Sequence, residues 1–129
     1  NNSCYYLKRP FSQQMLFDTI LNVYNYENNS LLKKNEYTKE DLCKVPAQKI
    51  LLAEDNKINQ AVIKGLLEDT NIEVFYANDG EEVLNELYNS EYKYKLILMD
   101  INMPNIDGYE ATANIREHYL YDDVQIVAL

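Results

Sequence analysis

Two apolar runs in this chain end abruptly on acidic residues. Leu96–Met99 is followed by Asp100, and Ile50–Ala53 is followed by Glu54 and Asp55. Strands that are apolar throughout are typical of parallel sheets that helices cover on both faces. Because the carboxyl ends of parallel strands lie at the same edge of a sheet, we expect the three carboxyl groups to meet there.

The sequence after residue 48 alternates between strand patterns and helix patterns. Strands are predicted at Lys49–Ala53, Ile72–Ala77, Leu96–Asp100 and Val124–Leu129. Apolar residues at helical spacing predict helices at Asn59–Leu67, Glu81–Tyr88 and Tyr109–Tyr119. This alternation predicts an α/β fold with a doubly wound parallel sheet, built from right-handed βαβ units.

Three carboxylates at one edge repel one another, and burying them is unfavourable unless a cation compensates. Mg²⁺ is typically bound by one or two carboxylates together with waters and phosphate oxygens. Any single acid among them is better explained as a solvated cap at a strand end. The matching apolar runs before Glu54, Asp55 and Asp100 favour a magnesium site for the three together.

Three motifs in this order resemble the receiver (response-regulator) domains of two-component phosphorelays. They are AEDNKINQ at 53–60, ANDGEEVL at 77–84, and MDINMP at 99–104 followed by Asp107-Gly108. The resemblance covers residues 48–129, and its first motif is most similar to receivers attached to hybrid histidine kinases. It implies the flavodoxin-like (CheY-like) receiver fold with strand order 2-1-3-4.

The resemblance also implies roles for individual residues. Asp100 is expected to accept a phosphoryl group from a phosphohistidine, and Glu54, Asp55, Asp100 and the backbone carbonyl of Asn102 to hold Mg²⁺. The implied partner is a histidine kinase or a histidine phosphotransfer domain, and the implied parent is a hybrid histidine kinase or a tandem-receiver protein. The domain itself would be a phosphoacceptor and not a stand-alone enzyme. The alternative function is a receiver-fold docking or dimerisation module that is not phosphorylated.

The sequence departs from this family after the fourth predicted strand, because it stops at Leu129. Receivers have a hydroxyl residue directly after the fourth strand and a lysine at the end of the fifth. These groups bind the phosphoryl group and stabilise its developing charge. We therefore expect slower phosphoryl transfer from residues 49–129 alone, which form a receiver lacking its last strand and helices.

The first 25 residues resemble the missing part. Residues 3–10 predict a short strand that ends at Pro10, and the apolar spacing after Ser12 predicts a helix. This order is similar to the fifth strand and helix of a receiver, with Arg9 in place of the lysine as a phosphate-side cation. Because Arg and Lys are not equivalent at a compact phosphate site, the domain of origin is expected to be degenerate. We interpret residues 1–25 as the tail of a preceding receiver-like domain; the alternative is an unrelated amphipathic helix.

Residues 26–48 are interpreted as a linker with no core of its own, because Asn, Lys, Glu and Ser dominate them. A linker of this length lets the N-terminal strand and helix fill the vacant fifth position of the sheet. They do so either in the same chain, as a circular permutation, or in a neighbour, as a domain-swapped homodimer. Both arrangements require Arg9 to lie near Asp100.

The net charge and the cysteine content narrow the kinds of partner and the cellular location that we expect for this fragment. A net charge of −9 disfavours nucleic acid and anionic membranes as partners of this fragment. Cys4 and Cys43 show no metal-binding spacing, which indicates reduced thiols and a cytoplasmic location. The apolar runs are too short to span a bilayer, although the parent protein is free to be membrane-anchored.

Overall fold

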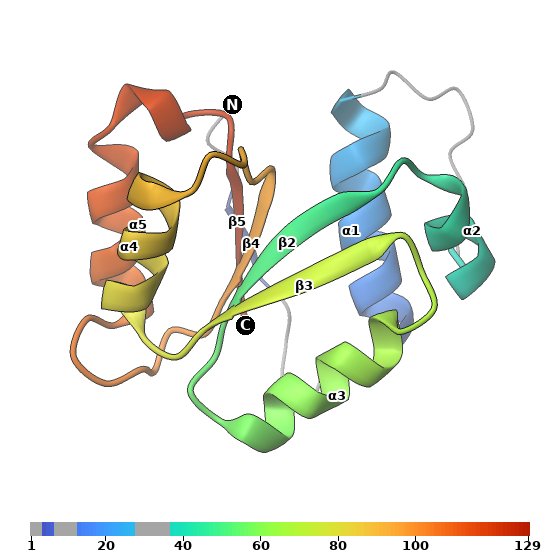
Figure 1. Cartoon of the computed structure of the whole chain (residues 1–129), viewed down its shortest axis with the longest axis horizontal. Helices are drawn as coiled ribbons and strands as arrows, with labels where there is room; N and C mark the ends of the chain where they lie inside the picture. Colours follow the sequence, from blue (N-terminus) through green and yellow to red (C-terminus); the bar gives the residue numbers. More distant parts are fainter. Residues whose placement is uncertain (1–3, 7–12, 28–36) are drawn as a thin grey trace.

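The computed structural model describes residues 4–6, 13–27 and 37–129, and the structural statements below concern these residues. It contains a five-stranded sheet between two layers of helices (Figure 1). The strands are β1 Cys4–Tyr6, β2 Gln48–Ala53, β3 Ile72–Ala77, β4 Leu96–Met99 and β5 Gln125–Ala128. The helices are α1 Gln13–Glu27, α2 Lys39–Lys44, α3 Lys57–Leu67, α4 Gly80–Asn89, α5 Gly108–Arg116 and the 3₁₀ turn η1 Tyr119–Tyr121. In this part of the chain no helix has the length and apolar character that crossing a membrane requires.

The order of strands in the sheet is β1-β5-β4-β2-β3, and every pair is parallel. The four strands that follow the linker therefore lie in the predicted order 2-1-3-4, which confirms the predicted fold. In this sheet the carboxyl ends of β2 and β4 are adjacent, because Ala53 pairs with Met99. The residues that follow these two strands are the acids on which the sequence analysis centred.

One predicted helix ends earlier than expected. The spacing of apolar residues predicts a helix up to Tyr119, but α5 ends at Arg116 and η1 follows. The Arg116 guanidinium donates to the carbonyl oxygens of Tyr121 and Val124, at 3.0 and 2.7 Å. These bonds satisfy carbonyl groups of the loop that leads to β5, and they hold that loop against the end of α5.

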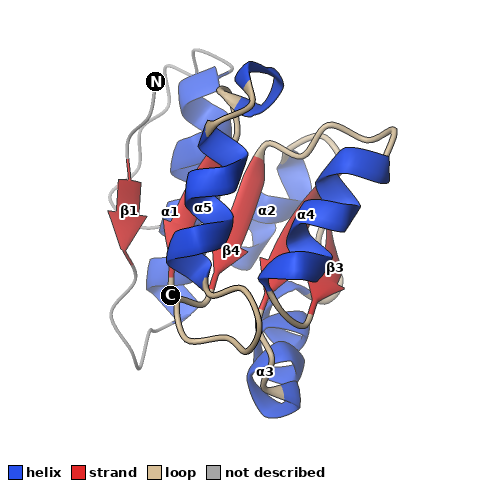
Figure 2. Ribbon diagram, turned by 90° about the vertical axis from the view of Figure 1, so that its left-hand side faces the viewer, coloured by secondary structure: helices blue, strands red, loops and turns tan. Residues whose placement is uncertain are grey.

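The N-terminal strand lies at the fifth position of the sheet in this chain. Cys4, Tyr5 and Tyr6 pair in parallel with Ile126, Val127 and Ala128 of β5. Figure 2 shows β1 at the outer edge of the sheet, and the strand order places it beside β5. Of the two predicted arrangements, the structure shows the one within a single chain; the swapped homodimer and the origin of residues 1–25 stay predictions. Arg9 lies outside the described residues.

Each face of the sheet carries its own hydrophobic core. Helices α1, α2 and α3 cover one face, while α4 and α5 lie side by side over the other (Figure 2). Helix α1 contributes Leu16, Phe17 and Ile20, all essentially inaccessible to solvent. Because they pack in the same core as Ile50 of β2 and Ile63 of α3, α1 is part of the domain's core and not an appendage.

The segment predicted as a linker also contributes to that core. Tyr37 and Leu42 are buried among the residues that α1 packs against. The entry to α2 is bound to α1, because the amide of Gln14 donates to the carbonyl of Tyr37 at 2.7 Å and the Tyr37 N–H donates to Asp18 at 3.0 Å. The segment's polar composition did not indicate that Tyr37 and Leu42 are buried.

The packing of α1 gives a first test. Phe17→Ala leaves a cavity in the shared core, and we expect the free energy of unfolding to fall by about 3–5 kcal/mol. Urea unfolding followed by circular dichroism and by tyrosine fluorescence should still show one coincident transition. Met15→Ala on the exposed side of α1 is the control, with an expected change within about 0.5 kcal/mol. A separate early transition for the Phe17 variant would show that α1 folds apart from the sheet.

Candidate functional site

The predicted acids follow the ends of two neighbouring strands, where the sheet's hydrogen bonds continue for one more residue. The N–H of Asp100 donates to the carbonyl of Ala53 at 2.8 Å, and the N–H of Glu54 donates to the carbonyl of Ala77 at 3.0 Å. Backbone pairing therefore fixes both acids in register with their neighbours. This is the local reason that the side chains after β2 and β4 converge.

The structure brings Glu54, Asp55 and Asp100 together. One carboxylate oxygen of each can be chosen so that all three atoms lie within 4.8 Å of one another. Glu54 and Asp100 are buried, with 1% and 6% of their surface exposed, whereas Asp55 is exposed. The cluster is thus a negatively charged site that is closed on the protein side and open to solvent at Asp55.

Backbone groups next to the acids bind two of their carboxylates. The N–H of Asn56 donates to Glu54 Oε1, and the N–H of Asn102 donates to Asp100 Oδ1, each at 3.1 Å. In each case the backbone N–H of the residue two positions further along the chain orients the carboxylate. Asn102, the fourth predicted site residue, therefore begins the loop beside Asp100, with an exposed side chain.

The loop between β4 and α5 is held close to Asp100 by contacts that the sequence analysis did not predict. The N–H of Gly108 donates to the carbonyl of Ile101 at 2.9 Å, and a Cβ atom at Gly108 would lie 2.5 Å from the carbonyl oxygen of Asp100. Asn105 adopts a positive φ of 62°, and its amide donates to Asp79 at 2.8 Å. The sequence does indicate a turn here, because it contains Asn and Gly. A turn pattern does not reveal which part of the backbone the turn packs against.

Gln60, the last residue of the motif at 53–60, is a further residue at this edge for which no role was predicted. Its side-chain amide donates to the backbone carbonyl of Glu54 at 2.6 Å. By contrast, Asp79 and Asp107 accept hydrogen bonds from the first turns of α4 and α5. They are the N-caps of these helices and lie outside the acidic cluster.

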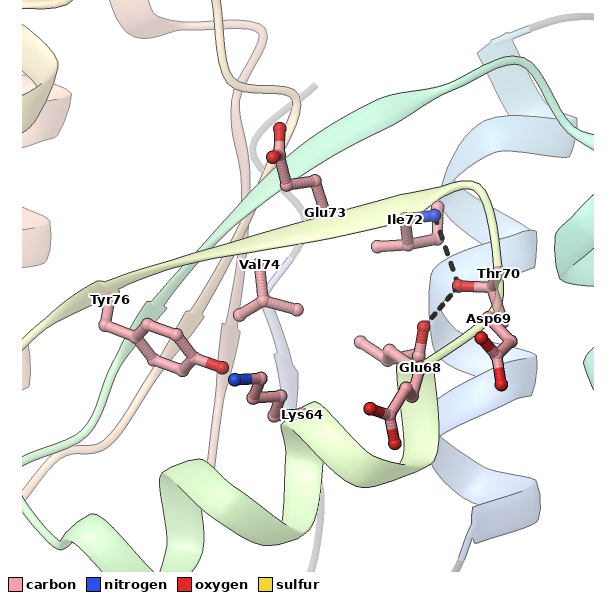
Figure 3. A pocket seen from close by; sticks show the side chains of 9 residues that line it. Lys64, Glu68, Asp69, Thr70, Ile72, Glu73, Val74 and Tyr76 are labelled. Carbon is pink, nitrogen blue, oxygen red and sulfur yellow. Dashed lines mark hydrogen bonds between the residues drawn. The ribbon is translucent and has the colours of Figure 1, made fainter.

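A groove of about 420 Å³ lies between α3 and the free edge of β3 (Figure 3). Charged and polar residues along it include Lys64, Glu68, Asp69, Glu73 and Tyr76, and burial raises the pKa of the Tyr76 hydroxyl. Glu54, Asp55, Asp100 and Asn102, the predicted site residues that the structure describes, do not line this groove. The groove and the acidic cluster are therefore separate places, and the cluster lies at the carboxyl edge of the sheet.

The acidic cluster fits a small divalent cation. Mg²⁺ binds oxygen ligands at about 2.0–2.1 Å, so two oxygens on opposite sides of the ion are roughly 4 Å apart. No two of the three carboxylate oxygens are more than 4.8 Å apart, which is close to the largest separation within such a coordination shell. The donor set consists of hard oxygen ligands, which suits Mg²⁺ or Mn²⁺ better than softer metals.

The close approach of Gly108 to Asp100 predicts that no side chain larger than that of glycine fits at position 108 without a backbone shift. Gly108→Ala forces the backbone of Asp100 or the start of α5 to move, and we expect the free energy of unfolding to fall by about 1–3 kcal/mol. Gly65→Ala is the matched control, because Gly65 lies in α3 with open space around it. There, alanine should raise stability by up to about 1 kcal/mol. Urea denaturation of both variants measures this contrast, and equal effects would contradict it.

Comparison with characterised proteins shows similarity to receiver domains of hybrid kinases. The chain is 47% identical over 73 residues to hybrid signal transduction histidine kinase I of Dictyostelium discoideum, an alignment that covers 54% of this chain and 4% of that protein. It is 42% identical over 85 residues to the osmosensing histidine protein kinase SLN1 of Saccharomyces cerevisiae, covering 63% of this chain and 7% of that protein. The chain thus spans less than a tenth of the length of these two relatives.

A solved structure supports the same relationship. The receiver domain of sensor histidine kinase PA1611 from Pseudomonas aeruginosa, solved with a magnesium ion coordinated in its active site cleft, is 38% identical to the chain. It superimposes with a TM-score of 0.58 over 64% of this chain and 66% of that one. The sequence pattern of the response regulator receiver domain matches residues 50–129, which are more than half of the chain. The chain therefore belongs to the response regulator receiver domain family of two-component signalling.

Proposed function

We propose that this domain accepts a phosphoryl group on Asp100 from a phosphohistidine, and that Glu54, Asp55, Asp100 and the backbone carbonyl of Asn102 hold the Mg²⁺ ion that the transfer needs. The observation that carries the proposal is the convergence of three carboxylates at the carboxyl edge of the sheet. Membership of the receiver family supports it, as does the magnesium ion in the receiver of PA1611.

In this proposal Asp100 is the nucleophile. A carboxylate oxygen of Asp100 forms a bond to phosphorus, the bond from phosphorus to the donor's imidazole nitrogen breaks, and the electron pair of that bond returns to the imidazole. Asp100 suits this role because β4 and the N–H of Asn102 hold its carboxylate in one orientation. Phosphoryl transfer depends chiefly on such positioning and on charge stabilisation.

In this proposal Glu54 and Asp55 serve to bind the metal ion that balances the negative charge of the site. Glu54 and Asp55 carry negative charge beside the carboxylate that has to approach a phosphoryl group, which is itself negative. Bound Mg²⁺ would offset this repulsion and draw charge from the phosphoryl oxygens. Asp55 is the exposed member of the cluster, so it lies on the side from which solvent and a donor reach the site.

The surface beside the site is suited to a protein donor. Ile58 and Val62 are one turn apart on α3, and 74% and 51% of their surfaces are exposed. Helix α3 begins two residues after Asp55, so this apolar pair continues directly from the acidic cluster. We assign it to the docking of the histidine-bearing domain, since a donor has to cover this side of the site to bring its phosphohistidine to Asp100.

Phosphorylation is tested with acetyl phosphate, a small donor that transfers its phosphoryl group with release of acetate. Incubation with Mg²⁺ should add about 80 Da, one HPO₃, to the intact mass of the chain. Chelation of Mg²⁺ should abolish the gain, and Asp100→Asn should show none. Asp107→Asn, at a helix N-cap outside the cluster, is the matched control and should still be labelled.

The outcome also separates the two functions that the sequence left open. Mass gain in the parent but not in the Asp100 variant supports the acceptor. Absence of any gain, with the chain folded and Mg²⁺ bound, would contradict the acceptor and favour a docking or dimerisation module.

The docking role of Ile58 and Val62 predicts that their replacement slows transfer from a protein donor far more than transfer from a small donor. Replacing both Ile58 and Val62 with Asp should slow transfer from a phosphorylated histidine phosphotransfer protein by at least about tenfold, because an apolar contact is lost and charge is added beside the acids. The rate with acetyl phosphate should fall far less. Leu120→Asp, at an exposed apolar position in η1, is the control. Equal slowing with both donors would contradict the assignment of this surface.

A further inference from the structure

Gln60 lies on the buried side of α3 and joins two strand ends through one amide group. Its Nε2 donates to the backbone carbonyl of Glu54 at 2.6 Å and to Oδ1 of Asn78 at 3.1 Å. Only 8% of its surface is exposed. A buried carbonyl that loses its donor is costly, so these bonds constrain the backbone around Glu54.

Asn78, the second acceptor of the Gln60 amide, is itself held by further hydrogen bonds. Its Oδ1 also accepts a hydrogen bond from Lys57 Nζ at 2.8 Å, and its Nδ2 donates to Glu82 Oε1 at 3.1 Å. The oxygen and nitrogen ends of the amide therefore face different partners, which fixes its orientation. Gln60 thus donates to an acceptor that is itself held by α3 and α4.

The carbonyl that Gln60 binds belongs to the peptide group between two acids of the cluster. A peptide group is planar, so fixing the direction of the Glu54 carbonyl also fixes the direction of the Asp55 N–H and restricts the backbone torsions that lead to both side chains. The N–H of Gln60 additionally donates to the carbonyl of Asn56 at 3.0 Å. One residue of α3 therefore holds the turn 54–56 at two of its three carbonyl groups.

We propose that Gln60 is a positioning residue for the metal site: its amide holds the peptide group between Glu54 and Asp55 so that both carboxylates face Asp100. This inference rests on the proposed function, because it assumes that the cluster binds Mg²⁺. Gln60 itself contacts neither the ion nor the phosphoryl group. Its effect is on the affinity for the metal, through the direction of the acids.

The test is Mg²⁺ binding by the whole chain carrying Gln60→Met, measured by isothermal titration calorimetry. Methionine keeps the length of the side chain and removes both hydrogen bonds. We expect the dissociation constant for Mg²⁺ to rise by about tenfold, as is typical when the support of a metal ligand is lost. The rate of labelling by acetyl phosphate should fall at limiting Mg²⁺ and return to within about twofold of the parent at saturating Mg²⁺.

Ala61→Met is the matched control, because it introduces the same side chain at the next, exposed position of α3. It should leave the affinity for Mg²⁺ unchanged. Circular dichroism establishes that each variant is folded. If Gln60→Met does not fold, Asn78→Ala replaces it, with an expected loss of about threefold in affinity for Mg²⁺, because it removes one of the two hydrogen bonds of the Gln60 amide.

The outcomes distinguish this inference from the function on which it rests. A folded Gln60→Met chain with the parent's affinity for Mg²⁺ overturns the positioning role and leaves the proposed function intact; equal affinity of a folded Asn78→Ala chain does the same when that variant is the one measured. A parent chain that binds no Mg²⁺ overturns both. Weaker binding that saturating Mg²⁺ restores supports the inference, because a purely structural role would lower stability without changing affinity.

Discussion

The mutual repulsion of three carboxylates is the constraint on which the carboxyl edge of this sheet depends. Two of them, Glu54 and Asp100, are buried, and one oxygen of each of the three lies within 4.8 Å of the others. Such a cluster forms only where rigid neighbours hold it. The pairing of β2 with β3 and β4 supplies the rigidity, and the N–H groups of Asn56 and Asn102 supply partial positive charge.

Much of the fold could be predicted, because parallel sheets impose a strong pattern on sequence. Strands buried on both faces have to be apolar throughout, so Ile50–Ala53 and Leu96–Met99 were recognisable, and the acids after them were placed at one edge. The same reasoning could not find the contacts of Gln60 or Gly108. Both depend on how the backbone of a neighbouring loop folds back against the residue, and the spacing of residue types carries no record of that approach.

Two further features show where composition misleads. The segment around Tyr37 and Leu42 is polar on average, yet these two side chains are buried, because packing is decided residue by residue. Helical spacing continued past Arg116, but its guanidinium binds the carbonyls of Tyr121 and Val124 and the helix ends there. In both cases a few specific contacts outweigh a statistical tendency of the sequence.

The pairing of β1 with β5 sets an order for folding. Cys4 lies beside Ile126, so the edge strand cannot pair until almost the whole described chain has been synthesised. Helix α1, which follows β1, has its buried face in a core that includes Val127 of β5. During translation α1 is made before the strands that bury it, so part of its apolar face stays exposed until β5 has been synthesised. Closing so long a loop slows folding more than it lowers stability, so the cost of this connectivity is one of time.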